Sequence, residues 1–192
     1  TIKSYLENRS VPNARNLFET KINEIDDEIK YLNQLKSIIL ELMNGIDLSK
    51  SVKPGDFQLI QKEPETIYLG KVVDDIRSNF SQVVSFVQFC RKHNIASCSR
   101  NINYLLPRES LSKRRWEGPG QLYIRSPEGN ELIDGGLYLV VFDYLTNVFS
   151  GLTFRKIFQY IDENPLLIAG NTYVDCIIGD TESCDPNNFL MK

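Results

Sequence analysis

The 192-residue chain has 22 lysines and arginines against 25 acidic residues, so its formal net charge is −3 and its pI is about 5.3. This acidic balance argues against a basic nucleic-acid-binding surface, and no apolar run reaches the roughly 18 residues that span a bilayer. The opening "TIKSYLENRS" lacks a signal-peptide pattern, and the four cysteines form no CxxC pair. These observations predict a cytoplasmic, globular protein with reduced thiols.

A long amphipathic helix is predicted near the start of the chain. Residues 14–44 contain neither proline nor glycine, and their apolar residues recur in steps of three and four, which is typical of a coiled-coil seam. The "NG" at 44–45 predicts the end of this helix. We therefore expect a helical dimerisation segment, residues 1–45, followed by a globular domain, residues 46–192. The predicted dimerisation residues are Phe18, Ile22, Ile25, Ile29, Leu32 and Ile39.

The globular part repeats one order of elements. After the linker at 46–56, the patterns predict the strand "FQLIQKE" at 57–63, then a strand, a helix and two strands, and then the same four elements again. The predicted strands of the repeat lie at 66–72, 102–107, 121–126 ("QLYIRS"), 137–144, 172–179 and 188–192, and its predicted helices lie at 75–93 and 152–164. A shift of 71 residues lays Ile67 on Tyr138, and it makes Tyr104 the counterpart of Asp175. We therefore predict an α+β fold in which a long N-terminal coiled-coil helix precedes two β-α-β-β halves related by a pseudo-twofold axis, with a cleft between the halves.

An acidic residue interrupts the apolar stretch "NTYVDCIIGD" at residues 171–180. Strand alternation places Tyr173, Asp175 and Ile177 on one face, while the other face has the character of a helix-covered core. A carboxylate in such surroundings is costly unless a cation or hydrogen-bond donors meet it. One interpretation is a binding site for a lipophilic cation. The alternative is that Asp175 lies on the solvated side of an antiparallel sheet.

The strand "LYLVVFDY" at 137–144 supplies an aromatic row that fits the same site. Alternation places Tyr138, Val140, Phe142 and Tyr144 on one face, and aromatic rings attract cations. This row is expected to form one wall of the cleft. The candidate ligand-binding residues are therefore Asp175, Tyr173, Ile177, Tyr104, Tyr138, Phe142 and Tyr144.

Catalytic and metal-binding patterns are sparse. The chain has a single histidine, His93, and its spacing to Cys90 and Cys98 matches no standard zinc pattern. No nucleotide-binding or hydrolase motif is present. The cluster "SKRRWEG" at 112–118 either contacts nucleic acid or forms a solvated loop, with Trp116 able to cover the cleft. We predict neither an enzyme nor a metal or cofactor site.

Two segments resemble a known family of regulators. The stretch "TIKSYLENRS" with "NLFETKINEIDDEIKYLNQLKSII" resembles the end of the DNA-binding domain and the antiparallel dimerisation helix of MerR-family transcription regulators. Residues 56–192 resemble the GyrI-like effector-binding domain of the multidrug-responsive members. The strand "YVDCII" resembles the one that carries a buried, drug-binding glutamate. The resemblance therefore implies that Asp175 occupies the glutamate position and that Phe142 supplies ring contacts.

The resemblance also has departures. A winged helix-turn-helix is absent from this sequence, so we expect operator DNA to be bound only through an N-terminal domain that is missing here. Residues 45–56 contain no cysteine, which argues against the metal-sensing branch of the family.

The resemblance implies the ligand-sensing and dimerisation part of a MerR-type regulator. Its expected partners are a second copy of the chain, bound through the long helix, and a small lipophilic or cationic effector, with no membrane partner. Two alternatives remain. One is a GyrI-like small-molecule hydrolase, which would need paired acids in the cleft, but Asp175 is the only credible acid there. The other is a stand-alone protein-binding module, which would not need the long amphipathic helix.

Overall fold

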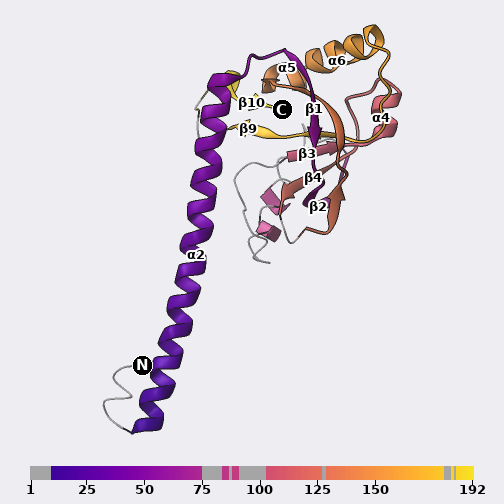
Figure 1. Ribbon diagram of the computed structural model, residues 1–192. Helices are drawn as coiled ribbons and strands as arrows, with labels where there is room; N and C mark the ends of the chain where they lie inside the picture. The colour runs from indigo at the N-terminus through magenta and orange to yellow at the C-terminus, as the bar shows by residue number, and fades with distance from the viewer. Residues whose placement is uncertain are drawn as a thin grey trace. The chain divides into compact units, whose positions relative to one another are not determined.

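A computed structural model describes residues 10–74, 84–86, 88–90, 103–126, 129–179, 183 and 185–192. The chain divides into two compact units, residues 1–40 and 41–192. The predicted α+β class is confirmed, because a long helix, α2 (Val11–Ser51), is followed by antiparallel sheets (Figure 1). No helix within the described ranges is long and apolar enough to cross a membrane.

Helix α2 begins with a recognisable cap. The Ser10 hydroxyl accepts a hydrogen bond from the Asn13 amide at 3.3 Å, and Pro12 lies in the first turn, where a missing N–H costs nothing. The predicted seam is exposed along the single chain. Phe18 is 61% exposed and Ile29 is 51% exposed, and the other predicted dimerisation residues lie between these values. None of the residues of α2 is buried, so the described part of this chain leaves the apolar stripe of the helix uncovered.

The predicted helix end at residue 44 is wrong, since α2 continues to Ser51. Gly45 stays helical because its missing side chain lets the backbone pass close to strand β9 (Cys176–Ile178). A Cβ atom there would lie 2.9 Å from the carbonyl oxygen of Ile177. The following turns pack Leu48 against a cluster of buried residues on the sheet. Tertiary packing therefore outweighs the local tendency of glycine to end a helix.

Within the described residues, the strands form three hydrogen-bonded groups, and every strand pair in them is antiparallel. Their orders are β1-β6, β7-β10-β9 and β5-β2-β4-β3-β8. Only Phe142 separates β6 from β7, and only Asp175 separates β8 from β9. The bounds of the strands not yet given are β1 Phe57–Lys62, β2 Glu65–Val73, β3 Asn103–Leu106, β4 Gly120–Arg125, β5 Glu131–Ile133, β6 Gly136–Val141, β7 Asp143–Tyr144, β8 Thr172–Val174 and β10 Leu190–Met191.

Both halves of the predicted repeat have the same strand order. In the first half β4 lies between β2 and β3, and in the second half β10 lies between β7 and β9. The halves meet where β3 pairs with β8, with Leu105 opposite Tyr173. Residues 84–86 and 88–90 are helical in the first half, and α6 (Leu152–Glu163) is the helix of the second half. The remainder of the predicted helix at 75–93 lies outside the described residues.

The main core lies on the face of the sheet that the helices cover. It joins Leu122, Ile124 and Val174 of the strands to residues of α6 and of two short helices, α4 (Arg108–Ser112) and α5 (Leu145–Phe149), which the sequence patterns did not predict. The opposite face carries two smaller clusters. One centres on Tyr123 and Ile67, and the other contains Phe142 and Val140. The candidate site lies beside these smaller clusters.

Candidate functional site

Asp175 lies at the interruption between β8 and β9. Its backbone is fixed by a reciprocal pair of hydrogen bonds with Lys192, in which each amide donates to the other residue's carbonyl at 2.8 Å. The residue is only 5% exposed, so the prediction of a buried acid is confirmed and the alternative of a solvated strand face is wrong. The irregular backbone at this point lets the side chain turn toward the neighbouring strands.

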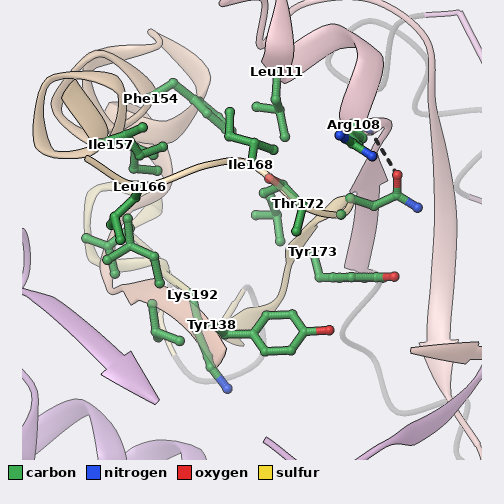
Figure 2. A pocket seen from close by; sticks show the side chains of 18 of the residues that line it. Arg108, Leu111, Tyr138, Phe154, Ile157, Leu166, Ile168, Thr172, Tyr173 and Lys192 are labelled. Atoms are coloured by element: carbon green, nitrogen blue, oxygen red, sulfur yellow. Dashed lines mark hydrogen bonds between the residues drawn. The ribbon is translucent and has the colours of Figure 1, made fainter. Parts of the chain in front are cut away.

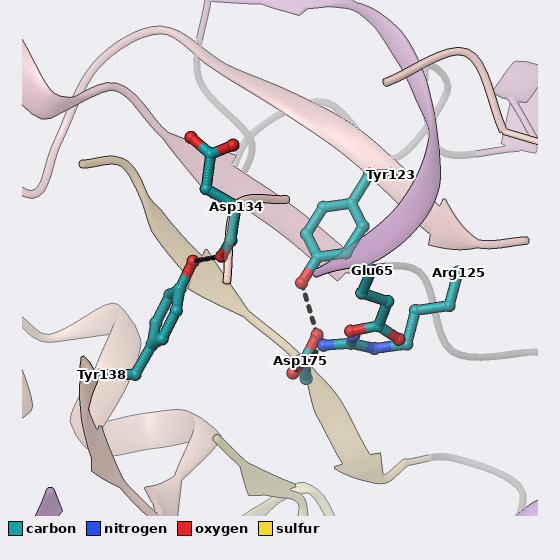
Figure 3. Close-up of polar contacts among 6 residues, drawn as sticks. All are labelled: Glu65, Tyr123, Arg125, Asp134, Tyr138 and Asp175. Carbon is teal, nitrogen blue, oxygen red and sulfur yellow. Dashed lines mark hydrogen bonds and ion pairs between the residues drawn. The ribbon is translucent and has the colours of Figure 1, made fainter. Parts of the chain in front are cut away.

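The Asp175 carboxylate already has partners within the chain. The Tyr123 hydroxyl donates to one carboxylate oxygen, and Nη2 of Arg125 donates to the other at 2.6 Å (Figure 3). Arg125 also forms an ion pair with Glu65. The prediction that Asp175 is an unpaired anion that needs an external cation is therefore wrong. The reason is that β4 presents Tyr123 and Arg125, two residues apart, on the face toward which Asp175 turns.

Tyr123 is a permanent donor in this network. Burial, and next the adjacent Asp175 carboxylate, raise the pKa of the Tyr123 phenol well above its usual range. Tyr123 also contacts Tyr173 edge to face, with the two ring centroids 5.8 Å apart. The predicted site residues Asp175 and Tyr173 therefore belong to one packed group that is centred on Tyr123.

A pocket of about 750 Å³ opens next to this group. Its apolar wall is formed by α6 and by the segment that follows it, and Phe154, Ile157, Leu166 and Ile168 line it (Figure 2). Strand β6 and the start of β8 supply the other walls. The Arg108 amide donates to the Asn171 side chain at 3.0 Å, which ties α4 to the segment before β8. The volume is within the range of small-molecule sites.

Two tyrosines give the pocket an aromatic side. Tyr138 and Tyr173 both line it. The Tyr138 hydroxyl donates to the backbone carbonyl of Asp134 at 2.6 Å, which fixes the orientation of the ring (Figure 3). Burial raises the pKa of both tyrosines. Asp134 raises that of Tyr138 further and the neighbouring Tyr138 raises that of Tyr173, so both phenols stay neutral at physiological pH. The rings present flat apolar surface together with polar edges.

The structure brings three of the seven predicted ligand-binding residues together at the pocket, namely Asp175, Tyr173 and Tyr138. The other four do not line it. Phe142 and Ile177 pack in the cluster beneath α2, Tyr104 lies in the main core, and Tyr144 is 39% exposed outside the pocket. The strand break at Phe142 and the start of α5 end the alternation on which the aromatic row was based.

Two lysines that the sequence analysis did not single out line the pocket. Lys62 ends β1 and Lys192 follows β10. The Lys62 ammonium lies 5.2 Å from the centroid of the Tyr138 ring, a distance that permits a cation–π contact. Burial, and next the charge of Lys192, lower the pKa of Lys62 to about 8. The sequence signal that could have identified them is their position, since each lysine lies at the end of a predicted strand.

Residues of the basic cluster at 112–118 contact helix α6. Arg114 donates to the Phe158 carbonyl at 3.1 Å and pairs with Asp162, and Trp116 stacks against Phe154 with 6.5 Å between ring centroids. Trp116 therefore packs with the main core and does not line the pocket. Among the described residues no group of three or more acidic, histidine or cysteine side chains is placed to hold a metal, and His93 and Cys98 lie outside those residues.

Comparison with known proteins supports the fold. No family model matches the sequence, and a comparison with curated proteins found no match. The structure is similar to the cryo-EM structure of the EcmrR–DNA complex in EcmrR-RPo, with a TM-score of 0.56 and 14% identity over 99% of this chain and 73% of that chain. It is also similar to the crystal structure of the EcmrR C-terminal domain, with a TM-score of 0.51 and 12% identity over 71% of this chain and 92% of that chain.

The fold of this chain is similar to that of EcmrR. EcmrR is a MerR-family multidrug regulator. The resemblance predicted from the sequence is therefore confirmed at the level of fold. The likeness covers the long helix as well as the sheets that follow it.

Proposed function

We propose that this chain is the dimerisation and ligand-sensing part of a MerR-type transcriptional regulator. The observation that carries the proposal is the pocket of about 750 Å³, lined by apolar side chains and two tyrosines, in a unit joined to a helix with an exposed apolar seam. Buried apolar walls with a few fixed polar groups are the usual form of a small-molecule site. The similarity to EcmrR supports the same assignment.

In this proposal the helix pairs with the helix of a second copy. An exposed stripe of large apolar side chains on one helix is costly in water, and burying it against an equivalent stripe removes that cost. DNA is contacted by another domain, joined on the N-terminal side of this sequence. Ligand binding acts by favouring one of two arrangements of the regulator, and the effect is limited by the difference between the ligand's affinities for them.

The contacts of the buried acids argue against the hydrolase alternative. A hydrolase needs acids free to react, but the Asp175 carboxylate is already bound by Tyr123 and Arg125. The second buried acid at the pocket, Asp143, accepts hydrogen bonds from Thr153 at 2.8 Å and from Asn147 at 2.7 Å. Both carboxylates are engaged in holding elements together, so a binding function fits the described residues better than a catalytic one.

The pocket can be tested with an uncharged probe. We expect the neutral compound 4-phenylbenzamide to bind, as measured by isothermal titration calorimetry, because its biphenyl body fits between the Tyr138 ring and the apolar wall. Tyr138→Ala removes the aromatic side and should weaken binding about 10-fold, the loss expected for one buried aromatic contact. Tyr144→Ala is the matched control, because Tyr144 lies outside the pocket. Absence of binding to wild-type protein, both by this compound and by charged compounds with the same biphenyl body, would contradict the proposed function.

Dimerisation can be tested separately. Ile25→Asp with Ile29→Asp places two charges in the exposed seam, and we expect monomers or insoluble protein. Asn23→Asp with Lys30→Asp is the control on the opposite helix face, where the dimer should persist. Sedimentation velocity at about tens of micromolar, a level at which a standard-size interface persists, distinguishes the outcomes. A monomeric wild-type chain would refute this part of the proposal.

A further inference from the structure

Among the described residues, the two lysines at the aromatic side of the pocket form no ion pair with a carboxylate. Lys62 and Lys192 come from different strands and both line the pocket. Figure 2 shows the Lys192 side chain beside the Tyr138 ring, over which the Lys62 ammonium lies at 5.2 Å. No carboxylate in the described ranges of the chain lies within 4.0 Å of either amine, although other lysines of the chain form such pairs.

The charges that act on Lys62 are unbalanced. The groups that face it are Lys192, Arg125 and Asp175, that is, two cations and one anion. The single anion is already shared, because Asp175 pairs with Arg125 at 2.6 Å. Asp134 and Glu131 act on the hydroxyl edges of the tyrosines instead. Two half-buried ammonium groups side by side repel each other, and burial adds to the cost.

We propose that the ligand of this pocket is an amphipathic monoanion, whose carboxylate is bound by Lys62 and Lys192 and whose apolar body lies against Tyr138 and the wall formed by α6. The proposal rests on the proposed function, since it names the class of effector for the same pocket. A carboxylate placed between the two amines relieves their repulsion and makes charge-assisted hydrogen bonds. A cationic ligand at this end of the pocket would meet the two lysines, while the Asp175 carboxylate that acts on Lys62 is already paired with Arg125.

Three probes of one shape and different charge test the proposal. They are 4-phenylbenzoate, 4-phenylbenzamide and 4-phenylbenzamidine, which share a biphenyl body and carry a negative charge, no charge and a positive charge. We expect the benzoate to bind about 10-fold more tightly than the benzamide, as for a charge pair that stays partly solvated. The benzamidine should bind most weakly. The measurement is isothermal titration calorimetry at pH 7 and constant ionic strength.

Variants assign the preference to the lysines. In Lys62→Met with Lys192→Met, and to a smaller extent in each single variant, the benzoate should lose its advantage of about 10-fold while the benzamide binds within about 2-fold of wild type. Unchanged benzamide binding also shows that the pocket is intact. Lys71→Met, a change at an exposed lysine outside the pocket, should leave all three affinities unchanged.

The preference should also depend on pH with a defined sign. The pKa of Lys62 is lowered to about 8, so the residue loses its proton between pH 7 and pH 9.5, roughly the window set by that value. Benzoate affinity should fall over this range, whereas benzamide affinity should not change. Benzoate binding no tighter than benzamide, or tightest binding by the benzamidine, would overturn the proposal and leave the proposed function in place. Failure of all three probes to bind would overturn both.

Discussion

The ion pair between Asp175 and Arg125 allows a quantitative test of the site's internal electrostatics. The Asp175 side chain is 7% exposed and the Arg125 side chain is 27% exposed. Arg125→Met therefore leaves a buried carboxylate whose remaining side-chain donor, among the described residues, is the Tyr123 hydroxyl. Removal of one partner from a fully buried pair costs about 3–5 kcal/mol of unfolding free energy. Because water reaches part of the guanidinium site, we expect about 2–3 kcal/mol here.

The companion substitution separates the pair from its surroundings. Asp175→Asn still accepts a hydrogen bond from Tyr123 and leaves Arg125 paired with Glu65, so we expect a smaller loss of about 1–2 kcal/mol. The double variant should lose less than the sum of the two, with a coupling energy of about 1–2 kcal/mol. Glu65→Gln is the control within the same network. The Glu65 side chain is 41% exposed, and loss of its charge should cost less than about 1 kcal/mol.

Urea unfolding gives these free energies. The fluorescence of Trp116, the sole tryptophan, and far-ultraviolet circular dichroism should report the same transition. With a slope of about 2–3 kcal/mol/M, Arg125→Met should lower the midpoint by about 1 M. Each variant is compared at one protein concentration, since dimer stability depends on it. An unchanged midpoint for Arg125→Met, or additive losses in the double variant, would refute the assignment of Arg125 as the partner of Asp175.

Three further predictions concern stability. Gly45→Ala should lower the unfolding free energy by about 1–3 kcal/mol, measured by urea unfolding, because the new Cβ meets the Ile177 carbonyl at 2.9 Å; an equal or higher stability would contradict the close helix–strand approach. Gly151→Ala should cost at least about 2 kcal/mol by the same assay, since Gly151 has a φ of +76° and the Trp116 ring occupies the space of a Cβ. Lys62→Met should be the more stable protein at pH 7, by about 1 kcal/mol after solvent screening is allowed for. The pKa of Lys62 is about 8 in the folded chain, compared with its ordinary value of 10.5. Between these pH values the unfolded chain binds more protons than the folded chain, so the wild-type protein regains stability as the pH rises from 8 to 10.5. A stability difference between Lys62→Met and wild type that does not change with pH would contradict this.

Local patterns predicted the elements of the fold because each element depends on its own periodicity. The strands "FQLIQKE" and "QLYIRS" and the helix over 152–164 are found close to their predicted bounds. The end of α2 was missed because it is decided by a contact with Ile177, more than a hundred residues later in the chain. The two interruptions at Phe142 and Asp175 were missed for a similar reason, since they arise where the strands join their partners in the sheet.

The candidate site was only partly predictable. Alternation placed Tyr173 and Asp175 on one face, and Asp175 is buried as expected. Its partner Arg125 was not predicted, because β3 separates β4 from β8 and a single sequence does not give that order. The "QLYIRS" pattern did contain a signal. Tyr123 and Arg125 alternate with Leu122 and Ile124, which marks a second strand with a polar, aromatic face.

A crystal structure of the protein with 4-phenylbenzoate would show directly whether the two lysines bind a carboxylate. We expect density for the biphenyl body between the Tyr138 ring and Ile157, with the carboxylate about 3 Å from the amines of Lys62 and Lys192, as in a charge-assisted hydrogen bond. The Asp175–Arg125 pair should be unchanged. Three results would refute the proposed anion site: ligand density with the carboxylate turned away from both lysines, density at another site, or an empty pocket at a saturating concentration of the benzoate.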